Sequence, residues 1–250
     1  MVTAKQLIAS AKSLNQIVLS DIKNGLLWKY YNTKRSAPTF EETRTAGKRY
    51  TNCMGGVHFA CTAAGIPASA LRWYGAAGKI KWINDDARRD AKRVFDFFTI
   101  KTKTVNDCLK KGIIQDGDII TYMNIVHTNM YLGTDHWYDT GHAYCNGSGE
   151  GAVFRKWIGE VKYGGRLVYD VIRLKGDHLY RVQVGAFNDK SKAQQRASRV
   201  RVKTGFDTFI EYTDMYRVYC GSFKDFNNAV KRIDDLANKG VSKAFIKCME

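Results

Sequence analysis

The stretch Thr51-Asn52-Cys53-Met54-Gly55-Gly56-Val57-His58-Phe59-Ala60-Cys61 places a thiol where a capped helix begins. Thr51 or Asn52 can cap this helix, because a short side-chain oxygen accepts hydrogen bonds from the free amides of the first turn. Gly65, followed by Pro67, ends it. Cys53 therefore lies at the positive end of the helix dipole, where a thiolate is stabilised. It is a candidate nucleophile, against the alternative of a small buried hydrophobic residue.

A thiol nucleophile needs an imidazole within hydrogen-bond reach and a group that holds the imidazole in place. His127 begins a β-rich run, and Asp139 lies on the next run beyond a tight turn, so hairpin pairing brings the two side by side. A carboxylate beside a histidine orients the ring and stabilises the imidazolium. We therefore expect Cys53 as nucleophile, His127 as base and Asp139 as the orienting group.

A zinc site is the chemical alternative, with four candidate ligands: His127, His136, His142 and Cys145. Zinc hydrolases also use a general-base glutamate, as in HExxH, and no such residue lies in this stretch. The six cysteines form no CxxC pair, so neither a zinc framework nor a disulfide scaffold is expected. We expect no metal and no cofactor, and we assign His142 to the substrate groove.

The composition favours an anionic partner. The chain of 250 residues carries 40 basic and 24 acidic side chains, a net charge of +16. Nucleic acid, anionic lipid and an acidic wall polymer all suit this charge, which does not choose among them. No apolar run approaches the roughly 18 residues of a membrane span, and residues 1–20 lack the apolar core of a secretory signal. We expect synthesis in the cytoplasm without a signal peptide.

The order of the predicted elements indicates an α+β fold for residues 1–175, with helices packed on an antiparallel sheet. Helices are expected near 1–22, 51–64, 85–98 and 105–111, and strands near 119–123, 127–133, 136–142 and 166–174. The polar segment 23–48 is either a surface loop or one wall of a substrate groove. Trp73 and Tyr74 are candidates for a sugar or peptide platform, although aromatic residues usually belong to the core.

The last third of the chain contains an internal repeat. Tyr-Arg-Val-Gln-Val-Gly-Ala-Phe at 180–187 recurs as Tyr-Arg-Val-Tyr-Cys-Gly-Ser-Phe at 216–223, 36 residues later. Each copy is followed by a polar turn, a helix and a second strand, which predicts a split βαβ domain over residues 178–250. Tyr180, Gln183 and Tyr216 are its candidate ligand-binding residues, because one face of the four-stranded sheet would be open.

The N-terminal motifs resemble the NlpC-type family of papain-like cell-wall cysteine hydrolases, which are related to the CHAP amidases. The resemblance lies in three pieces of sequence: Asn52-Cys53-Met54-Gly55-Gly56-Val57, Gln115-Asp116-Gly117-Asp118-Ile119-Ile120 and His127-Thr128-Asn129-Met130-Tyr131-Leu132-Gly133. It departs from the family at Asn52, where the family usually has aspartate, and at Asp139, where it often has His, Asn or Gln. The resemblance implies attack of the thiolate on an amide of the peptidoglycan stem, with Asn52 lining the site.

The repeat resembles the SPOR domain, which binds peptidoglycan glycan strands stripped of their peptides. Together the two resemblances imply a bacteriolytic wall hydrolase with a wall-binding module, similar to the endolysins that bacteriophages release through a membrane lesion. Its activity would be that of an N-acetylmuramoyl-L-alanine amidase or an endopeptidase, and anionic wall polymers would suit its charge.

Two non-enzymatic functions remain as alternatives at this point, namely wall binding without catalysis and RNA binding. Split βαβ domains with aromatic residues on the sheet are also RNA modules. The repeat lacks the aromatic-rich RNP pattern, however, with Gln183 and Cys220 where a stacking ring would help. We therefore expect no nucleic-acid partner.

Overall fold

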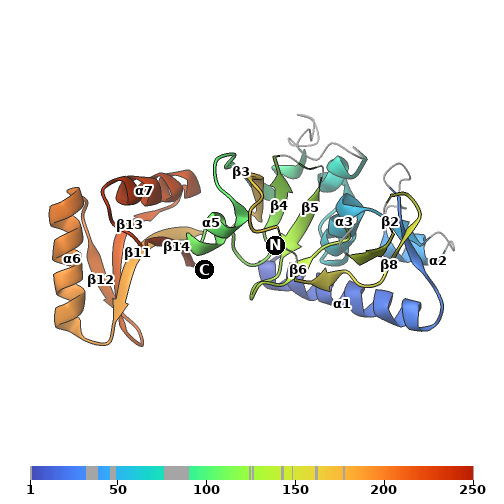
Figure 1. Cartoon of the computed structure of the whole chain (residues 1–250), viewed down its shortest axis with the longest axis horizontal. Coiled ribbons are helices and arrows are strands. Elements are labelled where there is room, and N and C mark those ends of the chain that lie inside the picture. Colours follow the sequence, from blue (N-terminus) through green and yellow to red (C-terminus); the bar gives the residue numbers. More distant parts are fainter. Residues whose placement is uncertain are drawn as a thin grey trace. The chain divides into compact units, whose positions relative to one another are not determined.

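The computed structural model describes residues 2–31, 39–45, 49–75, 90–123, 125, 127–141, 144–147, 149–160, 163–176 and 178–249, with only the backbone of 72–75. The chain divides into two compact units (Figure 1). The first comprises Met1–Val105 and Gln115–Lys175, and the second Asn106–Ile114 and Gly176–Glu250. Among the described residues, no helix is both long and apolar enough for a membrane span.

Helix α1 (Ala4–Lys23) begins at a capping box, in which Thr3 accepts from the amide of Gln6 and the Gln6 side chain accepts from the amide of Thr3. The predicted helix near 1–22 is confirmed, and one face of α1 is buried in the core with helix α3 (Cys53–Ala63). That face carries Leu7, Ala11, Leu14 and Val18. The first unit also contains helix α2 (Phe40–Thr45) and the 3-10 helix η1 (Ala68–Gly75).

A six-stranded sheet in the order β3-β10-β4-β5-β6-β9 holds most of the site-bearing strands. Its strands are β3 (Phe95–Thr99), β4 (Ile119–Tyr122), β5 (Thr128–Tyr131), β6 (Trp137–Tyr138), β9 (Ile158–Gly159) and β10 (Val168–Leu174). The predicted antiparallel meander is confirmed: Ile119 pairs with Met130, and Met130 pairs with Tyr138. A smaller sheet has the order β2-β1-β8-β7. It contains β1 (Trp28–Tyr30), β2 (Tyr50–Thr51), β7 (Cys145–Asn146) and β8 (Ala152–Phe154).

The predicted helix over 85–98 is wrong at its C-terminal end. Residues 76–89 lie outside the described part of the chain, and Phe95–Thr99 is strand β3, paired antiparallel with β10. The sequence Phe-Asp-Phe-Phe-Thr is rich in residues that favour strands. Pairing with the long strand β10 therefore overrides the helical spacing of its apolar residues.

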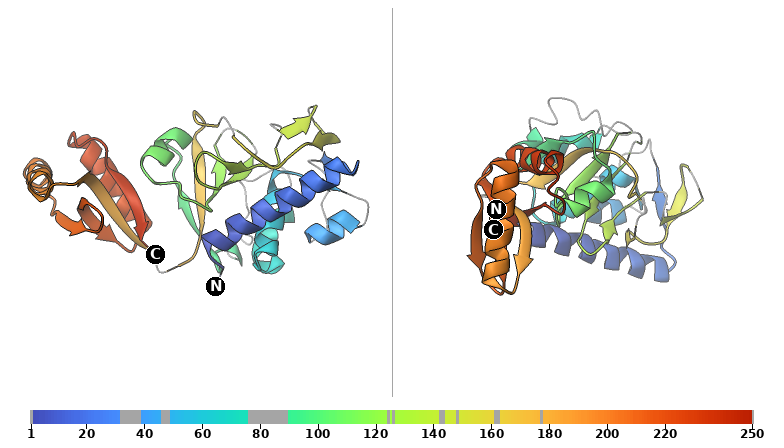
Figure 2. Two further views of the ribbon diagram at one scale, coloured as in Figure 1. Left: turned by 90° about the horizontal axis from the view of Figure 1, so that it is seen from below. Right: turned by 60° about the vertical axis from the view of Figure 1, so that its left-hand side comes forward.

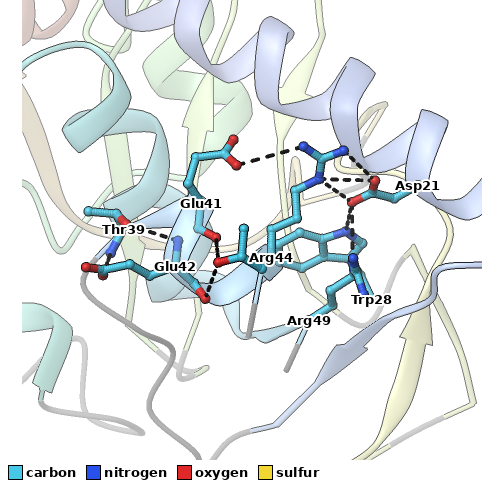
Figure 3. A network of polar contacts seen from close by, with 8 residues as sticks. Asp21, Trp28, Thr39, Glu41, Glu42, Arg44 and Arg49 are labelled. Atoms are coloured by element: carbon cyan, nitrogen blue, oxygen red, sulfur yellow. Dashed lines mark hydrogen bonds and ion pairs between the residues drawn. The ribbon is translucent and has the colours of Figure 1, made fainter. Parts of the chain in front are cut away.

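A buried carboxylate holds together the segments that precede Cys53 (Figure 3). Asp21, 1% exposed at the end of α1, accepts two hydrogen bonds from Arg44 Nε and Nη2 and one from Trp28 Nε1 at 3.0 Å. Arg49 lies 3.6 Å from the same carboxylate. Although burial disfavours the charged form, these cations and donors keep the pKa of Asp21 below its usual value. Asp21 thereby fixes the start of β2, which leads into helix α3.

The second unit has the predicted order β-α-β-β-α-β (Figure 2). Its elements are β11 (Leu179–Phe187), α6 (Lys190–Thr204), β12 (Phe209–Tyr212), β13 (Tyr216–Phe223), α7 (Phe226–Asn238) and β14 (Phe245–Met249). The strands form one antiparallel sheet in the order β12-β13-β11-β14, which both helices contact. The predicted domain, residues 178–250, leaves out the segment 106–114, which the structure groups with this unit. Part of helix α5 (Val105–Lys110) belongs to that segment, and Lys111 accepts a hydrogen bond from the amide of Ile246 on β14.

Candidate functional site

Cys53 is the first residue of helix α3, as the capping pattern predicts. The Asn52 side chain accepts from the amide of Gly55 at 2.9 Å and so caps the helix. The same side chain donates to the carbonyl of Tyr31, and the Asn52 carbonyl accepts from the Thr140 hydroxyl at 2.6 Å. Asn52 is therefore a structural cap with both ends of its side-chain amide engaged inside the protein, and its predicted role in binding substrate stays a prediction.

His127 and Asp139 lie side by side, as the hairpin argument predicts. His127 precedes β5, Asp139 follows β6, and the His127 Nε2 atom is 2.9 Å from Asp139 Oδ1. The carboxylate lies off the direction in which the ring N–H would donate, so the contact is a close ion pair and not an aligned hydrogen bond. Asp139 also accepts from the amide of Gly141 at 2.8 Å. Both side chains are buried, with Asp139 at 0% exposure.

The histidine carries a charge that its surroundings stabilise. Burial lowers the pKa of His127, but the charge of Asp139 and the contact with it outweigh burial. The neighbouring Cys53 side chain acts in the same direction, and together these effects raise the pKa of His127 to about 10. At neutral pH the ring is an imidazolium between a carboxylate and a thiol, as expected for a nucleophilic cysteine and its partner.

Two tyrosines that the sequence reasoning did not select enclose this histidine. The Tyr122 ring stacks on His127 at 6.0 Å between centroids, and the Tyr163 ring lies 5.2 Å away. Burial and the charge of Asp139 raise the pKa of both phenols, so both stay neutral and keep the surroundings of the ion pair apolar. The position of Tyr163 carries no local signal, because Tyr163 lies 36 residues beyond His127 in the chain.

A third tyrosine, Tyr30 on β1, interacts with Cys53. Burial raises the pKa of Tyr30, and the charge of Cys53 and a hydrogen bond between the two side chains raise it further. Tyr30 is only 3% exposed and belongs to the segment proposed as one groove wall. A neutral phenol beside the thiol can donate a hydrogen bond to a thiolate or to an oxygen that develops negative charge.

Two glycines make the close approach of these elements possible. A Cβ atom at Gly56 of α3 would lie 2.3 Å from Cγ2 of Thr140, so glycine lets the helix approach the segment that follows Asp139. A Cβ atom at Gly141 would lie 2.4 Å from Cε1 of His127 and 2.8 Å from Oδ1 of Asp139. Both positions therefore need glycine for space.

The other side chains named as candidates in the first unit are two aromatic residues and two histidines. The side chains of Trp73 and Tyr74 and all of His142 lie outside the described residues, so their predicted roles stay predictions. His136 is exposed and its Nδ1 atom hydrogen-bonds to the carbonyl of Thr134. No group of three or more side chains that could hold a metal ion gathers within the described part of the chain.

The sheet of the second unit presents a mixed aromatic and basic face. Phe209 pairs with Tyr219, Tyr219 with Gln183, and Gln183 with Phe245, which gives one row across all four strands. The Arg181 guanidinium lies over the rings of Phe209 and Tyr219 at 5.6 and 5.3 Å. Phe209 is 39% exposed whereas Tyr219 is 1% exposed, so Phe209 and the Arg181 guanidinium are the groups of this row that suit a sugar ligand, which offers both apolar C–H surfaces and hydroxyl groups.

Comparisons with known proteins address this second unit. A family model described as the SPOR domain matches residues 162–210 and 176–247. Residues 176–247 are a SPOR domain. The solution structure of the peptidoglycan-binding domain of the cell wall lytic enzyme CwlC from B. subtilis is similar, at 32% sequence identity and a TM-score of 0.28. That match covers 30% of this chain and 95% of the CwlC domain. No curated protein matches the chain.

Within the SPOR domain the three predicted ligand residues differ in their surroundings, and their roles stay predictions. Tyr180 is 3% exposed and packs edge-on against Phe226 of α7, so it belongs to the helix-covered face. Tyr216 is half-buried and packs against Tyr212. Gln183 lies in the row beside Tyr219 but is only 6% exposed. Arg181 follows Tyr180 on β11, and Phe209 lies on the edge strand β12. Both side chains are better placed than Tyr180 and Tyr216 to contact a ligand.

Proposed function

We propose that the chain is a peptidoglycan hydrolase that cleaves an amide bond in the peptide part of the bacterial cell wall. Residues 1–175 would form a papain-like, NlpC-type catalytic domain, and residues 178–250 would carry it to the wall. One observation above all supports the proposal: the buried His127–Asp139 pair interacts electrostatically with Cys53, which begins a capped helix. Burying an ion pair costs desolvation free energy. A thiol that served only for core packing would not need such a pair beside it.

The first step forms an acyl-enzyme. The Cys53 thiolate attacks the carbonyl carbon of the scissile amide, and the carbonyl oxygen takes the negative charge. The amide of Cys53, one of the free amides of the first turn of α3, and the Tyr30 hydroxyl are the donors placed to stabilise that oxygen. The His127 imidazolium then gives its proton to the leaving nitrogen as the C–N bond breaks, which leaves a thioester on Cys53 and a free amine.

The second step hydrolyses the thioester. Neutral His127 takes a proton from water, and the resulting hydroxide attacks the thioester carbonyl. The C–S bond breaks, a carboxylic acid leaves, and the thiolate–imidazolium pair returns. Asp139 stays ionised throughout and stabilises the charged ring in both steps.

The SPOR domain supports the choice of wall peptidoglycan as substrate. Binding to glycan strands stripped of their peptides would hold the catalytic domain where amidases have already acted, and raise its local concentration. The match to the SPOR family also favours wall binding over the RNA alternative. Synthesis in the cytoplasm followed by release through a membrane lesion, as for a phage endolysin, completes the proposal.

Digestion of purified walls tests the proposed function. We expect the release of soluble fragments with new free amino groups and no new reducing sugar ends, because an amide and not a glycosidic bond is cut. Mass spectrometry of the fragments then distinguishes an amidase, which separates lactyl groups from alanine, from an endopeptidase, which cuts inside the stem peptide. New reducing ends without new amino groups would contradict the proposal.

The Asp139→Asn substitution should lower activity by about 100-fold without abolishing it. Asparagine keeps an oxygen that can accept from the Gly141 amide, but it removes the negative charge that raises the pKa of His127 to about 10. In the unaltered protein the proton-donating imidazolium persists until the pH rises through about 10. In the variant the alkaline limb of the pH–rate profile should move to lower pH. An unchanged pH–rate profile would contradict the proposed role of Asp139 in orienting and charging His127.

A further inference from the structure

The two helices of the SPOR domain differ in charge although they occupy equivalent places in the repeat. Helix α6 carries six basic side chains and no acidic one. Helix α7, which follows the second copy of the repeated strand, carries two of each. Residues 176–250 contain 14 basic and 9 acidic side chains, so that without α6 the balance would be −1. Because the neutral helix α7 packs on the sheet at the equivalent position of the repeat, packing does not explain the positive charge of α6.

Four of these cations form one line along α6, the α6 stripe, at the helical spacing i, i+4, i+7 and i+11. The α6 stripe consists of Lys192, Arg196, Arg199 and Lys203. It extends over roughly 16 Å at a rise of 1.5 Å per residue. Lys192, Arg199 and Lys203 are exposed, while Arg196 is half-buried and donates to the carbonyl of Val184.

The α6 stripe is not explained by helix stability. Lys190 and Lys192 lie in the first turn of α6, where the helix dipole disfavours positive charge. Lys192 and Arg199 make no side-chain hydrogen bond or ion pair with any residue that the structure describes. Lys203, in the last turn, donates to the carbonyl of Gly240. The exposed cations Lys192 and Arg199, without a partner among the described residues, therefore point to a ligand outside the protein.

We propose that the α6 stripe binds a phosphodiester polymer of the bacterial wall, of the teichoic acid class, at a site separate from the sheet face that suits a glycan. A regular row of cations matches a chain of evenly repeated phosphates. The helix contains no aromatic residue, whereas single-stranded nucleic acid is bound through aromatic stacking platforms. The choice of a wall polymer over another polyphosphate rests on the proposed function, because that function places the chain at the wall.

Binding measurements with the full chain test this proposal, with Cys53→Ala present in every variant so that walls stay intact. The Lys192→Gln/Arg199→Gln variant should bind walls that retain teichoic acid about tenfold more weakly. The slope of log affinity against log salt concentration should fall by about 1 to 2. Binding to walls from which acid treatment has removed the teichoic acid should not change. The matched control is Lys224→Gln/Lys231→Gln, which removes two exposed charges from the second repeat and should bind both kinds of wall as before.

Equal weakening on both kinds of wall, or equal weakening by the control variant, would overturn the proposal. So would a loss confined to duplex DNA, which would assign the α6 stripe to nucleic acid. The result can be interpreted even if the unaltered chain cleaves no amide, because the measurement is of binding and not of turnover. Failure of the hydrolase proposal and failure of this one are therefore distinguishable.

Discussion

Replacing Cys53 with alanine should abolish wall digestion, with a loss of about 10⁴- to 10⁶-fold in rate, and leave wall binding unchanged. We expect so large a loss of rate because a chain without the nucleophile cannot form the acyl-enzyme. The remaining groups, His127 and Asp139, cannot replace the missing thiolate. Alanine is a good residue for a helix, and the Asn52 cap does not use the thiol, so α3 should still form. The measurements are release of soluble wall fragments and co-sedimentation with intact walls.

Cys61→Ala is the matched control, because it makes the same substitution on the same helix. Cys61 is 0% exposed, and burial raises the pKa of its thiol, so it is a neutral core group and not a nucleophile. We expect this variant to keep activity within about threefold of the unaltered protein at 25 °C, while its melting temperature falls because core packing is lost. Undiminished digestion by Cys53→Ala, or equal loss in both variants, would refute the assignment of the nucleophile.

The parts of the site that follow local rules could be predicted from the sequence. The cap at Asn52 and the start of α3 at Cys53 depend on a few adjacent residues. The meeting of His127 with Asp139 depends on one short hairpin, β5 to β6, whose register the alternation of residues sets. The β-α-β-β-α-β order of the SPOR domain followed from its repeat, because two similar segments adopt similar structures.

The parts that depend on distant contacts could not be predicted. Tyr163 reaches His127 only through the folded chain, and Phe95–Thr99 becomes a strand only because β10 lies beside it. On the SPOR sheet, the predicted ligand residue Tyr180 packs against Phe226 of α7. The β11–β13 pairing contains two register shifts, and Gly221 adopts a φ of +105° within the first of them. Such irregularities change which residues share a face, and a period of two does not reveal them.

Gly141→Ala should reduce activity at least 100-fold although it touches neither the sulfur nor the backbone of α3. The new Cβ atom would lie 2.4 Å from His127 Cε1 and 2.8 Å from Asp139 Oδ1, closer than real contacts allow. The backbone of Gly141 does not have a positive φ, so alanine adds this clash without backbone strain. The imidazole is buried against Tyr122 and Tyr163 and must move away from the carboxylate, and a displacement of about 1 Å can cost 100-fold in rate.

A second measurement separates this displacement from general unfolding. As the ring moves away from Asp139, the pKa of His127 should fall from about 10, which a histidine NMR titration detects. Wall binding through the SPOR domain should persist. Gly165→Ala is the control, because Gly165 is exposed and a Cβ atom there would meet nothing within 4 Å. If Gly141→Ala were as active as Gly165→Ala, or kept the raised pKa of His127, the tight packing of glycine against the ion pair would have no bearing on catalysis. The geometry instead predicts that one methyl group, placed between a charged ring and its carboxylate, disables the site while the fold remains.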